Sequence, residues 1–95
     1  MGAELIARDR FPIDDHSFVD IVIWRVPQPV RGCSHFFKYR LAYIESDRCV
    51  VRFDNETGKG DHKHIGRRES KIEFKSIEQL YDAFYEEVDL WRMTR

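Results

Sequence analysis

A short segment near the middle of the chain holds the residue types that most often carry acid–base chemistry. Residues 55–66 have the sequence NETGKGDHKHIG, with two histidines one residue apart, an acidic residue before them and three glycines. Histidine exchanges protons near neutral pH because its unperturbed pKa is about 6.5. If the chain is extended from Asp61, then His62 and His64 point to the same side, since side chains alternate along an extended chain. Two imidazoles on one side favour proton transfer or metal binding.

Proton transfer by two histidines suits the cleavage of RNA without a metal ion or cofactor. A base takes the proton from the 2′-hydroxyl, and an acid protonates the leaving 5′-oxygen. We expect His62 and His64 to fill these roles, with Asp54 or Asp61 orienting an imidazole. Fixed cations must also hold the phosphate oxygens. The basic residues expected to do so are Lys38, Arg40, Arg52 and Lys59.

Other interpretations of the same residues stay open. His62 and His64 with Asp61 or Asp54 offer three metal ligands, which would support metal-dependent phosphodiester hydrolysis. A glycine-rich polar segment can also be a solvated surface loop without chemistry. The third alternative is a non-catalytic protein that inhibits a target by binding it through a polar sheet face.

Two further residues are secondary candidates for chemistry. His35 follows a flexible loop and would reach a base or a phosphate, although a single histidine at the start of a strand is more often plain surface. Tyr39 falls on the apolar side of its predicted strand, so packing is its simplest role.

Size and composition limit the class of protein. The 95 residues, 42% of them apolar, fit one domain over residues 1–95, and no apolar run is long enough to span a membrane. Cys33 and Cys49 lie in no ligand pattern and indicate a reducing compartment. The N-terminus has no signal-peptide pattern. We therefore expect a cytoplasmic protein that does not associate with membranes.

The formal net charge of −1 hides a separation of charge along the chain. Residues 31–75 carry a net charge of +4, whereas residues 76–91 carry −5. The total alone argues against nucleic-acid binding, but the basic middle segment predicts where phosphate would bind.

The hydrophobic pattern predicts an α+β domain in which an antiparallel sheet of four to five strands packs against a C-terminal helix. Strands are expected at residues 4–12, 17–26, 35–44 and 49–54, with a last short one at 71–74. The second of these is almost continuously β-branched and aromatic, as in a strand buried on both faces. Glycines and charges predict a polar loop over residues 55–66. Ser76 and Gln79 form a capping box, and apolar residues then recur at helical spacing as far as Trp91.

The hairpin between the third and fourth predicted strands has one register that keeps both faces consistent. Pairs whose numbers sum to 94 set Leu41 against Phe53 in the core and Arg40 against Asp54 on the other side. A shift of one residue would set Leu41 against Arg52. The favoured register gives a polar sheet face that bears Lys38, Arg40, Arg52 and Asp54.

Three stretches carry a resemblance that covers the chain from about Arg8 to Val88. They are IWRVPQPVRGCSHFFKYRLAYI at 23–44, CVVRFDNETGKGDHKHIG at 49–66 and FKSIEQLYDAFYEEV at 74–88. The most specific block within them is D-N-E-x-G-K-G-D-H-x-H-I-G. These stretches are similar to the TumE family of small bacterial toxins. Phe53 stands where that family more usually has tyrosine, so residue 53 is not expected to transfer protons.

The resemblance implies the toxin of a type II toxin–antitoxin pair, with a helix-turn-helix antitoxin as its partner. It also implies ribonuclease activity and RNA as the substrate, but it brings no catalytic residues with it. The site assignment therefore rests on the chemistry of the residues themselves. Our leading prediction is a metal-independent endoribonuclease, and the sequence leaves open whether the chain forms a homodimer.

Overall fold

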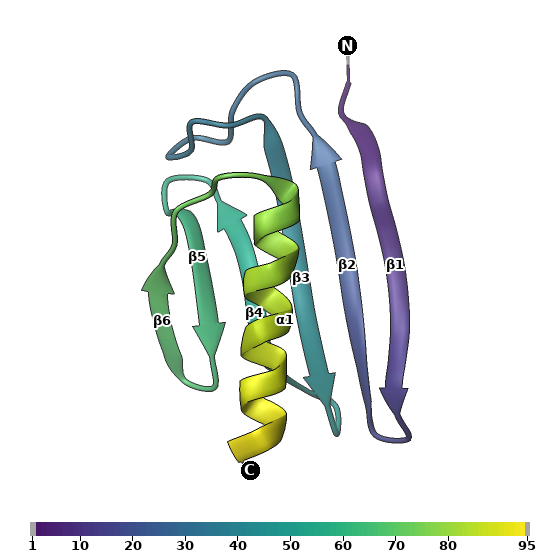
Figure 1. The fold of residues 1–95 in the computed structure, drawn as a ribbon. Coiled ribbons are helices and arrows are strands. Elements are labelled where there is room, and N and C mark those ends of the chain that lie inside the picture. Colours follow the sequence, from purple (N-terminus) through teal and green to yellow (C-terminus); the bar gives the residue numbers. More distant parts are fainter. Residues whose placement is uncertain (1, 95) are drawn as a thin grey trace.

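Six antiparallel strands in sequence order form one sheet over residues 2–94, the part of the chain that the computed structural model describes (Figure 1). A single helix crosses one face of this sheet, so the α+β class is confirmed while the predicted four to five strands are too few. The elements are β1 (Glu4–Asp14), β2 (Ser17–Arg25), β3 (Phe37–Glu45), β4 (Arg48–Glu56), β5 (Gly60–Ile65), β6 (Arg68–Lys71) and α1 (Ile77–Thr94). No helix within these described residues has the length and apolar character of a membrane span.

The additional strand comes from the segment that we predicted as a polar loop. β4 continues to Glu56, and after a short turn β5 runs from Gly60 to Ile65. Polar residues form strands here because β5 pairs through its backbone with β4 on one side and β6 on the other. The predicted strand at 71–74 is also wrong, since β6 ends at Lys71.

The β3–β4 hairpin has the predicted register from Arg40 to Tyr43, which includes residues of the polar face. Arg40 lies opposite Asp54 and Leu41 opposite Phe53, until a bulge after Tyr43 shifts the pairing by one residue. We call the face that α1 covers the helix side and the other face the open side. β2 alternates between buried residues and half-buried ones, so the expectation that it is buried on both faces is wrong. Among the described residues, no second layer covers the open side.

The core lies between the sheet and α1. Ser76 Oγ accepts a hydrogen bond of 3.1 Å from the backbone N–H of Gln79, which confirms that half of the capping box. The helix buries Leu80, Phe84 and Val88, and the ring of Phe84 meets that of Phe53 edge to face at 5.7 Å. These contacts fix α1 over β3 and β4 (Figure 1).

A half-buried carboxylate ties the loop before β3 to the start of β5. Asp61 Oδ1 accepts a hydrogen bond of 2.6 Å from the Tyr39 hydroxyl and lies 2.8 Å from His35 Nε2. The other ring nitrogen of His35 accepts a bond of 3.2 Å from the N–H of Phe37, so this imidazole is fully paired as a neutral donor through Nε2. The ring also stacks on Phe74 at 3.8 Å. We call His35, Tyr39, Asp61 and Phe74 the latch, because their contacts hold the loop before β3 against the sheet.

The same loop approaches the start of β5 closely at Gly60. Gly60 has a φ of +76°, and a Cβ there would lie 2.9 Å from the carbonyl oxygen of Gly32. Gly58 has a similar φ of +84°, but a Cβ there would meet only the end of the Arg31 side chain at 3.9 Å.

This pair of glycines provides a matched test. We expect Gly58→Ala to cost about 1–2 kcal/mol, because L-residues disfavour left-handed backbone. Gly60→Ala should cost clearly more, because it adds a clash with the Gly32 carbonyl. Urea unfolding of both variants measures the difference, and an equal loss in the two would contradict the close approach.

Tyr39 gives a second prediction, for alkaline pH. Burial first, and then the hydrogen bond to Asp61, raise the pKa of the Tyr39 phenol far above its ordinary value of about 10. Above about pH 10 the phenol loses its proton in the unfolded chain but keeps it in the folded chain. The free energy of unfolding therefore falls as pH rises, by up to about 1.4 kcal/mol per pH unit.

Tyr39→Phe removes this loss. At neutral pH the variant should be less stable by about 1 kcal/mol, since one hydrogen bond to Asp61 is absent. The difference in free energy of unfolding between the variant and the wild type should then become smaller between about pH 10 and 11, because only the wild type loses stability through Tyr39. Chemical denaturation across this range measures it, and parallel curves for the two proteins would refute the argument.

Candidate functional site

The two histidines of the central segment lie side by side on the open side of the sheet. In β5, His62 is opposite Asp54 of β4, and His64 is opposite Arg52. Their rings meet edge to face with centroids 5.0 Å apart. The prediction that an extended segment points both imidazoles to one side is confirmed, and the same alternation places Arg52 and Asp54 beside them.

His62 is held between a carbonyl group and three carboxylates. Its ring nitrogen Nδ1 lies 3.1 Å from the carbonyl oxygen of Gly60, which can only accept, so the Nδ1–H group donates this hydrogen bond. The other nitrogen, Nε2, lies 2.8 Å from Asp54 Oδ1, 3.3 Å from Glu56 Oε1 and 3.7 Å from Glu69 Oε2. Only 2% of the His62 side chain is exposed. One histidine nitrogen therefore faces several negative charges in a buried place.

Four buried side-chain atoms within residues 2–94 have no hydrogen-bond partner, and all four belong to this one group. They are Arg52 Nε, Asp54 Oδ1, His62 Nε2 and His64 Nε2. Close approaches exist among them, such as 3.1 Å between Arg52 Nε and Asp54 Oδ2, but their directions do not suit hydrogen bonds. Buried polar atoms are nearly always paired in folded proteins. We call Arg52, Asp54, His62 and His64 the open-side cluster.

A hollow at the edge of the sheet gives access to this cluster. It has a volume of about 470 Å³ and is lined by Gly58, Lys59, His62, Glu69, Ser70 and Lys71. The side chains of His64 and Glu69 are 26% and 44% exposed, so the cluster meets solvent through them as well. The hollow therefore meets the cluster at His62.

The predicted phosphate-binding cations lie on β3, on β4 and in the turn that follows β4. Arg52 belongs to it, and Arg40 is exposed on the adjacent strand, opposite Asp54. Lys38 is exposed two residues farther along β3, on the same side. Lys59 lies in the turn between β4 and β5, where it lines the hollow.

Asp61 does not join the cluster, although it was a candidate to orient these imidazoles. Its carboxylate is on the helix side, bound to Tyr39 and His35, because neighbouring residues of a strand face opposite ways. The two secondary candidates His35 and Tyr39 thus belong to the latch. Burial raises the pKa of the nearby Cys33 thiol, so this thiol stays protonated and is no activated nucleophile.

Glu56 and Glu69 are site residues that the sequence analysis missed. Glu69 Oε2 lies 3.6 Å from His64 Nε2, since β6 sets Glu69 opposite His64. The glycines of the two turns indicate that residues 55–71 form two consecutive hairpins. This interpretation of the sequence would have placed Glu69 opposite His64.

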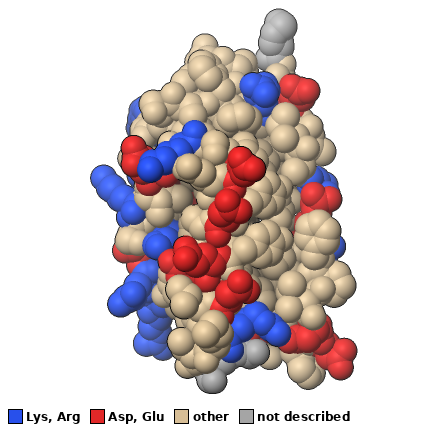
Figure 2. Space-filling model, in the orientation of Figure 1, with Lys and Arg blue, Asp and Glu red and all other residues tan. Residues whose placement is uncertain are grey.

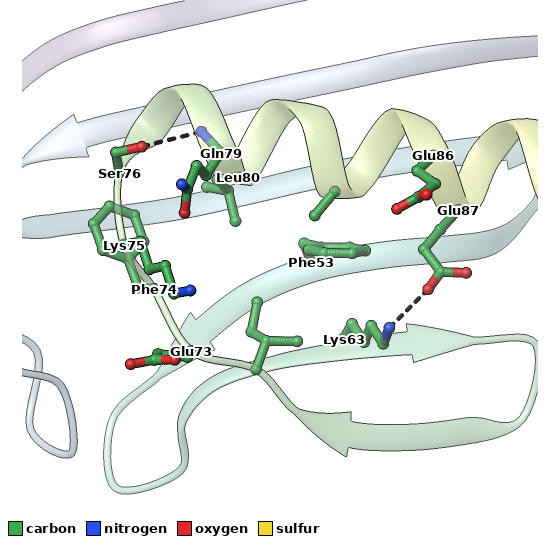
Figure 3. A pocket seen from close by; sticks show the side chains of 12 residues that line it. Phe53, Lys63, Glu73, Phe74, Lys75, Ser76, Gln79, Leu80, Glu86 and Glu87 are labelled. Carbon is green, nitrogen blue, oxygen red and sulfur yellow. Dashed lines mark hydrogen bonds and ion pairs between the residues drawn. The ribbon is translucent and has the colours of Figure 1, made fainter.

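A second hollow lies on the helix side and holds none of these groups (Figure 3). It is bounded by the first half of α1, the chain that leads into it, and β4 and β5. An ion pair of 2.7 Å between Lys63 and Glu87 closes one end of it (Figure 3). Its charged groups are of both signs and it contains no histidine, so the open side carries the stronger candidate site.

Comparison with known families gives an independent result. The family model described as "Toxin TumE" matches residues 3–92, which is nearly the whole chain. No curated protein and no solved structure matches the sequence. The match confirms the resemblance found in the sequence, and the chain belongs to the TumE family of toxins.

Proposed function

We propose that this toxin is an endoribonuclease and that the open-side cluster is its active site. One observation carries the proposal, namely that two histidines, a carboxylate and an arginine converge there with four buried polar atoms unpartnered. Side chains that fold without satisfying their own hydrogen bonds are typical of sites that complete their bonding with a substrate or ligand.

The charges around the cluster favour an anionic substrate. Arg40 and Lys38 on β3, and Lys71 on β6, are exposed on the open side beside it. The acidic side chains of α1 lie on the helix side (Figure 2). The exposed basic side chains on the open side would therefore attract a polyanion to that side of the sheet.

The phosphodiester is the bond that these groups suit. Arg52 and Arg40 would hold the non-bridging oxygens and stabilise the charge that develops on phosphorus during attack. The imidazoles would lie next to the bond that breaks. Whether they exchange protons directly, as the metal-independent mechanism requires, depends on access, and His62 is almost completely buried.

As a member of a toxin family, the chain is expected to have an antitoxin that neutralises it. The helix-turn-helix class of that partner is part of the proposal. An antitoxin that covers the open side would block the proposed active site directly.

The first test is cleavage of RNA by the purified protein. We expect His64→Ala and Arg52→Ala each to lower the cleavage rate by about 100-fold or more, because each removes a group that contacts the reacting phosphate or its catalyst. His16→Ala is the matched control, since His16 is exposed in the turn between β1 and β2 and should leave the rate unchanged.

Three results would contradict the proposal. They are unchanged cleavage by both site variants, loss of cleavage in the His16 control, and a wild-type protein that inhibits growth without cleaving any RNA. The last result would support the non-catalytic alternative. Folding of each variant is checked by its unfolding midpoint.

RNA binding gives a second test, of the side on which the substrate lies. Arg40→Gln should weaken RNA binding and reduce the salt dependence of the affinity by about one phosphate contact. Arg68→Gln removes an exposed charge from β6, opposite Ile65 and thus on the helix side, and should have little effect. Equal effects in the two variants would show that RNA does not select the open side.

A further inference from the structure

We propose that the open-side cluster binds one divalent transition-metal ion through His62 Nε2, His64 Nε2 and a carboxylate oxygen of Asp54. One ligand atom from each of these three residues lies within 4.8 Å of the others. Ligand atoms on a single tetrahedral zinc ion lie about 3.3 Å apart, given bond lengths of about 2.0–2.1 Å. Small side-chain rotations would therefore bring the three atoms onto one ion.

The protonation of His62 prepares it as a ligand. Its Nδ1 donates to the Gly60 carbonyl at 3.1 Å, so Nε2 is the ring nitrogen that is left to bind a ligand. Histidines that bind metals usually hold their other ring nitrogen in this way, and the bond fixes both the tautomer and the ring orientation.

The carboxylates around His62 Nε2 favour a cation at this position. Nε2 of His62 lies within 4 Å of the carboxylates of Asp54, Glu56 and Glu69. A proton on Nε2 would need an acceptor in line with it, yet neither this atom nor Asp54 Oδ1, 2.8 Å away, has a hydrogen-bond partner. A metal ion accepts lone pairs from both atoms and removes the repulsion between them.

The donor set selects the class of metal. Two imidazoles with a carboxylate suit zinc, manganese, iron or cobalt, whereas magnesium and calcium prefer oxygen ligands alone. Glu69 Oε2 lies 3.7 Å from Nε2 of His62 and 3.6 Å from Nε2 of His64, so it is placed to complete the coordination. The hollow beside Lys59 and Lys71 provides the path for entry.

A second group of residues has similar spacing but not the other features. Ligand atoms of Cys33, His35 and Asp61 also lie within 4.8 Å of one another. Both nitrogens of His35 are already hydrogen-bonded, and a metal would need the thiolate of Cys33, whose pKa is raised by burial. This second group therefore serves as the control.

The consequence for catalysis rests on the proposed function. A bound divalent ion lowers the pKa of a coordinated water and so supplies the nucleophile for phosphodiester hydrolysis. His62 would then act from its buried position as a ligand, with no need to reach the substrate. Cleavage would follow the metal-dependent alternative, not the metal-independent mechanism predicted from the sequence.

The experiment measures metal binding without RNA. Metal-stripped protein is titrated with Zn²⁺ by calorimetry and with Co²⁺ by absorption. We expect one equivalent to bind, with visible Co²⁺ bands and without the near-ultraviolet band of a thiolate ligand. His64→Ala and Asp54→Asn should weaken binding by about 100-fold or more, whereas Cys33→Ala and His16→Ala should bind as the wild type does. Circular dichroism verifies that His64→Ala, at a partly exposed position, remains folded.

The outcomes separate this inference from the proposed function. The metal site is refuted if the wild type binds no ion, if His64→Ala binds normally, or if Cys33→Ala abolishes binding. RNA cleavage that persists in excess chelator also refutes a catalytic ion, and would support the metal-independent mechanism. Metal binding without any RNA cleavage would leave the site in place and refute the endoribonuclease proposal.

Discussion

The pairing of β4 with β5 positions the four polar side chains at the centre of the candidate site. Asp54 lies opposite His62 and Arg52 opposite His64, so these four side chains come to one side of the sheet. A slip of one residue would send the histidines to the helix side, against the apolar core. Gly60 contributes to this register because its left-handed backbone lets the chain turn back at the start of β5.

The same alternation explains which parts of the fold could be predicted. The C-terminal helix and the β3–β4 register follow from apolar spacing and from the pairing of Leu41 with Phe53. β5 has no such pattern, because the helix side of the sheet there bears Lys63 where an apolar residue would be expected. Lys63 instead lies over the ring of Phe53 and pairs with Glu87, so a charged residue covers the core and conceals the strand.

The sequence predicted that the two histidines of the candidate site lie together, but it did not predict which carboxylates lie beside them. Two histidines one residue apart must share a side in any extended chain. The choice between Asp54 and Asp61 as their partner could not be made from the sequence, since it depends on whether the segment is a loop or a strand. Glu69 comes close to the histidines only because β6 pairs with β5. The four residues of β6 are polar and exposed, so no hydrophobic pattern predicts this strand.

The open-side cluster also opposes folding locally. An unsatisfied buried polar group costs about 1–3 kcal/mol. The four atoms without hydrogen bonds lie together on β4 and β5, where the ion pairs of Asp54 with Arg52 and His62 offset part of that cost. The apolar core between α1 and β2–β4 must offset this cost. A ligand that pairs with these atoms would reverse it, and so would stabilise β5 and β6 more than the rest of the sheet. The stability of β5 and β6 and the affinity of a ligand for the open-side cluster therefore depend on the same interactions.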